Sequence, residues 1–154
     1  MTIEDDIAFF EQVPLLQRLG TGALRILAIG AENYTVEAGQ MLFVEGEPAD
    51  CGFILQEGSF DLKSERASEG AVISEPATLL GESALLSQTL RPATATALED
   101  CRVVRISRAM FLKMLEGYPE AAQRLRELIA ARAEQWTSEI ERVRAALARG
   151  TGPQ

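Results

Sequence analysis

The sequence predicts an α+β fold in which helices flank an antiparallel β domain, and three observations support this prediction. Apolar residues recur at helical spacing over residues 4–31 and again over 107–149. Between them, over 33–106, short runs rich in Val, Ile, Leu, Phe and Thr alternate with turn signals. The 47% of hydrophobic and 25% of charged residues are typical of a chain that buries a core. We therefore expect a single domain over residues 1–154, with only the tail at 150–154 disordered.

The N-terminal segment is expected to form two or three short helices. Its apolar positions follow helical spacing, but Pro14 and the turn at 20–22 interrupt the pattern. The helical pattern resumes after residue 107 and is broken once, at 117–119. A long helix is then predicted over 119–149, because proline is tolerated in the first turn of a helix.

The middle of the chain has the spacing of a β-sandwich or barrel. Glycines at positions 39, 46, 58 and 70 mark turns between short apolar runs. These runs predict strands near residues 33–37, 41–45, 51–57, 59–64, 71–74, 93–98 and 101–106.

The charge balance of the chain argues against nucleic acid as a partner. Fifteen Lys and Arg residues against 23 Asp and Glu residues leave a net charge of −8. Affinity for a polyphosphate backbone comes from cationic contacts, so this chain alone is not expected to bind DNA. No apolar stretch approaches the roughly 20 residues that cross a bilayer, and the acidic start lacks the cationic region of a secretory signal. We expect a cytoplasmic protein without membrane attachment.

The residues that usually carry catalysis or hold metals are scarce. The chain has no histidine, and its two cysteines, Cys51 and Cys101, lack the spacing of a metal or redox motif. Both cysteines are predicted to be small core residues. Without histidine the usual general base and nucleophile pairs are missing, so neither an enzyme, a metal site nor a cofactor is expected.

The stretch 81–96 interrupts the β pattern and carries residues suited to an anionic ligand. Gly81 permits a close backbone approach, and residues 83–87 can form a helical turn whose N–H groups point towards an anion. Arg91 offers a planar fork for two phosphate oxygens. Glu82 beside an anion needs a donor from the ligand, such as a ribose 2′-hydroxyl. Each residue alone is equally typical of a turn or a solvated surface, so the prediction depends on the combination.

The residue order in this stretch closely resembles the phosphate-binding cassette of the cyclic nucleotide-binding domain family. That cassette reads Gly-Glu-apolar-Ala-Leu, then a short variable piece, then Arg followed by small residues, as in 81–85 and 91–96 here. Segments 9–16 and 37–48 are similar to the family's first helix and opening hairpin. The resemblance implies an antiparallel β-roll of jelly-roll type whose last helix covers the nucleotide base. It also implies a ligand site that comprises Gly81, Glu82, Ser83, Ala84, Arg91 and Pro92.

Pro92 departs from the family pattern, which commonly has Ser, Thr or Ala directly after the cassette arginine. Proline has no backbone N–H and no hydroxyl to donate to a phosphate. At about 1 kcal/mol for an ordinary hydrogen bond and about 3 kcal/mol for one to a charged group, we expect weaker binding rather than none.

The last helix is predicted to form a parallel homodimer through residues 129–147. Apolar residues there are spaced alternately by four and three, which is the heptad pattern of a coiled coil. The alternative is a single helix packed on the β domain, but about 30 helical residues span about 45 Å, more than a domain of this size. Thr137 and Ser138 resemble a pair in the catabolite activator branch of the family, which implies contacts with an adenine amine from the two subunits. A Thr-Ser pair bonded to its own backbone is the alternative.

Two functions remain open from the sequence. The first is a sensor that binds a cyclic nucleotide, cAMP in preference to cGMP, and acts on an effector protein that the sequence does not identify. The second is a degenerate β-roll that only dimerises. A transcription regulator would need a helix-turn-helix after the dimer helix, and the sequence ends at Gln154. Haem and iron–sulfur sensors need ligands that this composition does not provide.

Overall fold

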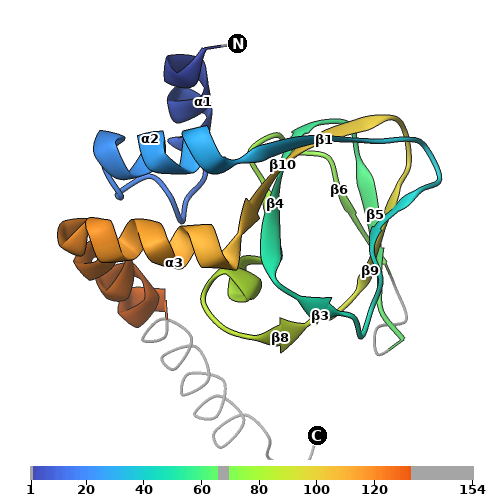
Figure 1. The fold of residues 1–154 in the computed structure, drawn as a ribbon. Coiled ribbons are helices and arrows are strands. Elements are labelled where there is room, and N and C mark those ends of the chain that lie inside the picture. Colours follow the sequence, from blue (N-terminus) through green and yellow to red (C-terminus); the bar gives the residue numbers. More distant parts are fainter. Residues whose placement is uncertain (1, 66–69, 133–154) are drawn as a thin grey trace, which may run out of the picture.

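The computed structural model describes residues 2–65 and 70–132 and contains a β-roll with helices at one end (Figure 1). The helices are α1 (Ile3–Phe10), α2 (Thr21–Gly30), the short 3₁₀ helix η1 (Glu82–Leu85), α3 (Arg108–Gly117) and a further helix over 119–132. The strands are β1 (Glu32–Val36), β2 (Met41–Phe43), β3 (Pro48–Ala49), β4 (Cys51–Glu57), β5 (Phe60–Lys63), β6 (Ala71–Ile73), β7 (Leu79–Leu80), β8 (Thr89–Leu90), β9 (Thr94–Ala97) and β10 (Cys101–Ser107).

The roll is built from two antiparallel sheets. One sheet has the strand order β1-β10-β4-β7, the other has the order β2-β9-β5-β6, and β3 pairs with β8 as a small ribbon. The inner faces of the two sheets enclose a core of buried residues that includes Phe60 from one sheet and Leu55 and Val103 from the other. Alternate residues of each strand point inwards, so the apolar residues of the predicted strands form the core of the roll.

Side chains cap helices α1 and α3, and both helices pack with α2 in a second core. Thr2 caps α1 in a capping box with Asp5, in which the Asp5 N–H donates to Thr2 Oγ1 at 3.2 Å. The buried faces of α1 and α2 join residues of α3 and of β4 and β10 in a second core. Ser107 caps α3, because its Oγ accepts the N–H of Met110 at 3.1 Å. Strand β10 therefore leads directly into a helix that is held against the end of the roll.

The predicted α+β fold and β-roll are confirmed, and each of the seven predicted strands corresponds to an observed strand. The short strands β3, β7 and β8 were not predicted, because two residues carry no alternation that a pattern could reveal. Cys51 and Cys101 are buried as free thiols. The predicted helix over 119–149 is described as helix over 119–132. Its remainder, and the tail at 150–154, lie outside the described residues.

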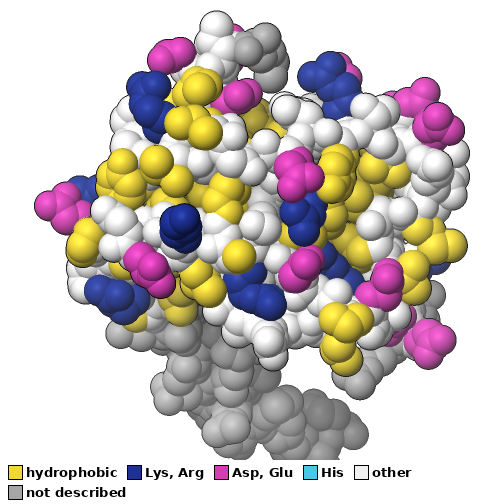
Figure 2. All heavy atoms as spheres, in the orientation of Figure 1, with side chains coloured by type: hydrophobic (Ala, Val, Ile, Leu, Met, Phe, Trp, Pro, Cys, Tyr) yellow, Lys and Arg dark blue, Asp and Glu magenta, His cyan; other side chains and the backbone are white. Residues whose placement is uncertain are grey.

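The surface mixes charges of both signs. On the face drawn in Figure 2, Lys and Arg side chains lie next to Asp and Glu side chains and among apolar ones. Helices in the described ranges all lack the length and apolar character that a membrane span requires.

Candidate functional site

The cassette predicted over 81–96 connects β7 to β9 at one end of the roll. Gly81 follows β7 in the left-handed conformation, with φ of 80°. The left-handed backbone favours glycine, and a Cβ at this position would collide with Nη1 of Arg91, so a larger residue would displace the guanidinium. The helical turn predicted over 83–87 is the 3₁₀ helix η1 over Glu82–Leu85. The chain then passes through β8 to Arg91, and the guanidinium of this arginine lies next to Gly81.

Arg91 is buried, with 5% of its surface exposed. Its backbone is fixed on both sides, because its N–H donates to Glu47 O at 2.8 Å and its carbonyl accepts the N–H of Gly46 at 2.9 Å. The guanidinium lies 4.5 Å from the ring centroid of Phe43 and 5.6 Å from that of Phe53. These contacts hold a positive charge inside the roll by cation–π attraction.

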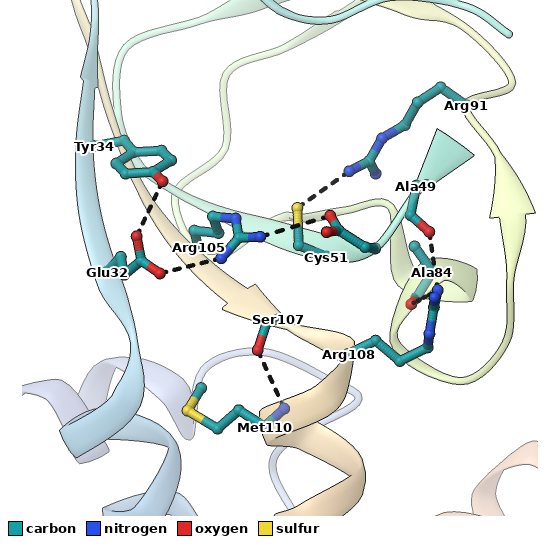
Figure 3. A network of polar contacts seen from close by, with 11 residues as sticks. Glu32, Tyr34, Ala49, Cys51, Ala84, Arg91, Arg105, Ser107, Arg108 and Met110 are labelled. Carbon is teal, nitrogen blue, oxygen red and sulfur yellow. Dashed lines mark hydrogen bonds and ion pairs between the residues drawn. The ribbon is translucent and has the colours of Figure 1, made fainter. Parts of the chain in front are cut away.

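One end of this guanidinium lacks a partner. Nη2 of Arg91 donates to Sγ of Cys51 at 3.2 Å (Figure 3). Nη1 is buried and has no hydrogen-bond partner among the described residues. A buried charged donor without an acceptor is costly, about 1–3 kcal/mol or more, so this atom marks the place where an anion would be stabilised.

A cavity of about 560 Å³ lies over the cassette. Of the predicted site residues, Gly81, Glu82, Ser83, Arg91 and Pro92 line it. Phe43 and Leu62 add apolar surface from β2 and β5, and Ile129 and Arg132 close it from the final helix. The cavity therefore combines one buried cation, one carboxylate and apolar walls, which is the composition of a small-molecule site.

Ala84 does not line this cavity. Its side chain is fully buried in the core, and its N–H donates to Gly81 O at 3.1 Å. The tight 3₁₀ turn directs this side chain inwards and uses its N–H internally. Contact between Ala84 and the ligand stays a prediction. Ala84 instead shapes the turn that presents Glu82 and Ser83.

Arg132 is the main site residue that sequence reasoning missed. Its Nη1 forms an ion pair with Oε1 of Glu82, fifty residues away in the chain. The two side chains are 42% and 40% exposed, so the pair is open to solvent and of modest strength. An arginine on a polar helix face carries no sequence signal for such a contact. The ion pair joins the final helix to the cassette across the cavity.

Arg108, the first residue of α3, also contacts the cassette. Its Nη1 donates to the carbonyls of Ala49 at 2.9 Å and Ala84 at 3.1 Å (Figure 3). The same atom donates to the carbonyl of Ser87 at 3.1 Å. Backbone carbonyls at the end of η1 are thus bound by a side chain from a neighbouring helix. The position of the cassette turn is therefore tied to the start of α3.

Two predicted features lie largely outside the described residues. Thr137 and Ser138 lie outside the described ranges, and so does most of the predicted dimer seam over 129–147. Its first residue, Ile129, is 39% exposed and borders the cavity. In the described ranges no cluster of three His, Cys, Asp or Glu residues is arranged to hold a metal ion.

Comparison with known proteins places this geometry in a family. Residues 34–118 match the family model of the cyclic nucleotide-binding domain. A Brucella abortus cyclic nucleotide-binding-like protein of known structure is 39% identical, with a TM-score of 0.64 over 73% of this chain and 98% of that chain. The regulatory domain of Toxoplasma gondii PKA, solved with cAMP, is 25% identical, with a TM-score of 0.68 over 79% of this chain and 47% of that chain.

The sequence similarity extends to longer proteins. An uncharacterized NTE family protein of Mycobacterium tuberculosis is 37% identical over 109 residues, which are 70% of this chain. The match spans only 18% of that protein. The shared fold and family are those of regulatory, ligand-binding domains. The chain belongs to the cyclic nucleotide-binding domain family.

Proposed function

We propose that this protein is a sensor that binds cAMP in the cavity over the cassette and transmits binding through its final helix. The observation that carries the proposal is the buried Nη1 of Arg91, which has no hydrogen-bond partner among the described residues and belongs to a residue that lines the cavity. A cyclic phosphodiester is a monoanion that can accept this N–H and neutralise the buried charge. The cAMP bound to the related Toxoplasma domain supports the same ligand class here.

Glu82 and Arg132 provide a route from ligand to helix. In the proposed complex the ribose 2′-hydroxyl donates to the Glu82 carboxylate, which in the free protein pairs with Arg132. The ligand then competes with Arg132 of the final helix for the Glu82 carboxylate, and Arg132 is released when the ligand binds. A change at the cassette thereby alters how the final helix lies on the roll, and an effector protein would respond to that change.

The preference for cAMP over cGMP is proposed from Thr137 and Ser138, together with a homodimer through residues 129–147. In that arrangement Thr137 of one subunit and Ser138 of the other contact the adenine amine, so binding and dimerisation depend on each other. A cytoplasmic location and an effector protein as partner complete the proposal.

The competing function is a β-roll that has lost ligand binding. Two observations favour it: Pro92 gives the cavity no backbone N–H, and the Glu82 carboxylate is already occupied by Arg132. In this case Glu82 and Arg132 would stay paired, and no ligand would separate them.

Titration calorimetry with cAMP, cGMP and 5′-AMP distinguishes the two functions. The sensor is expected to bind cAMP more tightly than cGMP, because of Thr137 and Ser138. It is expected to bind 5′-AMP weakly, because the single buried cation of Arg91 matches a cyclic monoanion better than a dianion. At 100 times its dissociation constant, cAMP is expected to stabilise the fold by about 2.7 kcal/mol. Flat titrations with all three nucleotides favour the degenerate roll, and equal binding of cAMP and 5′-AMP indicates a general anion site.

A further inference from the structure

Cys51 lies between two arginines at the start of β4. Its Sγ accepts an N–H from Nη2 of Arg91 at 3.2 Å, and Arg105 lies on its other side (Figure 3). The residue is 3% exposed, and burial raises the pKa of its thiol. The group is therefore an uncharged thiol at neutral pH, even though two guanidinium groups are close to it.

A thiol is an unusual acceptor at this position. Sulfur accepts hydrogen bonds weakly, whereas a carboxylate would form a strong ion pair with the same guanidinium. The nearby carboxylates are engaged elsewhere: Asp50 Oδ1 lies 3.6 Å from Nη2 of Arg105, and Glu82 pairs with Arg132. Within the described part of the chain, no ion pair joins a carboxylate to Arg91. Its orientation thus comes from Cys51 and from the aromatic rings, and none of these cancels its charge.

We infer that Cys51 is a positioning residue that orients Arg91 while leaving its positive charge available to the ligand phosphate. The inference rests on the proposed function, because it gives the reason why a neutral acceptor occupies this place. Orienting the Arg91 guanidinium and leaving its charge available to the phosphate then require different acceptors. A stronger acceptor would hold the guanidinium more firmly, but it would also compete with the phosphate for it.

Two isosteric variants separate these demands, C51N and C51D. Asparagine offers a neutral carbonyl acceptor, whereas aspartate of the same shape places a negative charge between Arg91 and Arg105 and beside Asp50. In the free protein, C51D is expected to melt at the same temperature as C51N or higher, because the carboxylate pairs with a buried cation. Its affinity for cAMP is expected to be lower than that of C51N by about tenfold or more. A merely structural role would change stability and affinity in the same direction.

The outcomes are decisive at each step. Calorimetry of the parent comes first: a parent that does not bind cAMP overturns the proposed function and this inference with it. If the parent binds, equal affinities of C51D and C51N overturn the role of Cys51 alone. So does a C51D variant that loses both stability and affinity relative to C51N.

A second pair of variants applies if C51D does not fold. C51S restores an acceptor of similar size, and C51A removes it. Serine is expected to bind cAMP within about threefold of the parent, whereas alanine is expected to lose about three- to tenfold, because Arg91 loses the acceptor that orients it. Equal affinities of C51S and C51A would contradict the inference.

Discussion

Glu82 of the cassette and Arg132 of the final helix form an ion pair across the mouth of the cavity, although fifty residues separate them in the chain. This contact joins the final helix to the cassette in the free protein. Both side chains are about 40% exposed, so solvent weakens the attraction and its contribution to stability is small, about 0–1 kcal/mol. A ligand that binds Glu82 can therefore replace this weak ion pair.

Replacing Arg132 by Gln is therefore expected to tighten cAMP binding by a few-fold at low salt, because Glu82 no longer has to leave its partner. The parent and the variant should converge as salt screens the ion pair. Calorimetry at low and high ionic strength measures both effects. R126Q is a matched control on the same helix, since Arg126 bonds only to nearby Gln123 in the described contacts. Weaker binding by R132Q would instead mean that Arg132 contacts the ligand itself.

Arg91 is the residue on which binding is expected to depend most. Truncation to Ala removes the buried cation and should cost about 2–5 kcal/mol of cAMP affinity. Because Nη1 is unpartnered in the free protein, the same change should cost less stability than a buried arginine usually does. Calorimetry and thermal unfolding of the same sample test both points. R102A, at an exposed arginine of β10, controls for general effects, and unchanged affinity of R91A would refute the site.

Gly81 and Gly39 form a matched pair for testing the contact with Arg91. Both have positive φ, 80° and 87°, so alanine strains either backbone similarly. A Cβ at Gly39 meets nothing within 4 Å, whereas one at Gly81 meets Arg91. G81A is thus expected to weaken cAMP binding by tenfold or more, on the order of the loss of a well-placed cationic contact, while G39A leaves affinity unchanged. Equal affinities of the two variants would show that the position of Arg91 does not matter.

Arg108 is expected to stabilise both the fold and the cassette. R108M keeps much of the apolar stem but loses the donors to three carbonyls, and should lower the free energy of unfolding by about 1–3 kcal/mol. The cassette turn should loosen, which amide hydrogen exchange at residues 82–87 would detect as faster exchange. R102M is the control. If exchange rises equally throughout the β-roll, Arg108 has a general rather than a local role.

The fold was predictable because it follows from local patterns. Alternating apolar residues indicated the longer strands, and apolar residues at helical spacing indicated α1 to α3. The spacing of Glu82 and Arg91 indicated the cassette. The partners of these residues were not predictable. Arg132, Arg108 and Cys51 contact the cassette from positions 21 to 50 residues away, and such contacts depend on tertiary packing. The buried placement of the Ala84 side chain was not predictable either, because a motif reveals which residues recur and not which way each side chain points.

The last prediction concerns the dimer, which joins the final helix to the signal. If residues 129–147 form a two-fold seam, replacing Ile140 and Val143 by Glu places like charges in a buried interface and should give monomers. Because Ser138 would then lose its place on the partner's nucleotide, the same change should weaken cAMP binding.

By linkage, cAMP should in turn tighten the dimer of the parent protein. Sedimentation of the parent and the double variant, with and without cAMP, measures both effects. E141K serves as a control that changes charge outside the apolar seam and its flanking positions. A parent that stays monomeric at high concentration contradicts the seam. A monomeric double variant with unchanged affinity contradicts the coupling alone, and binding at the cassette would then be complete within one subunit.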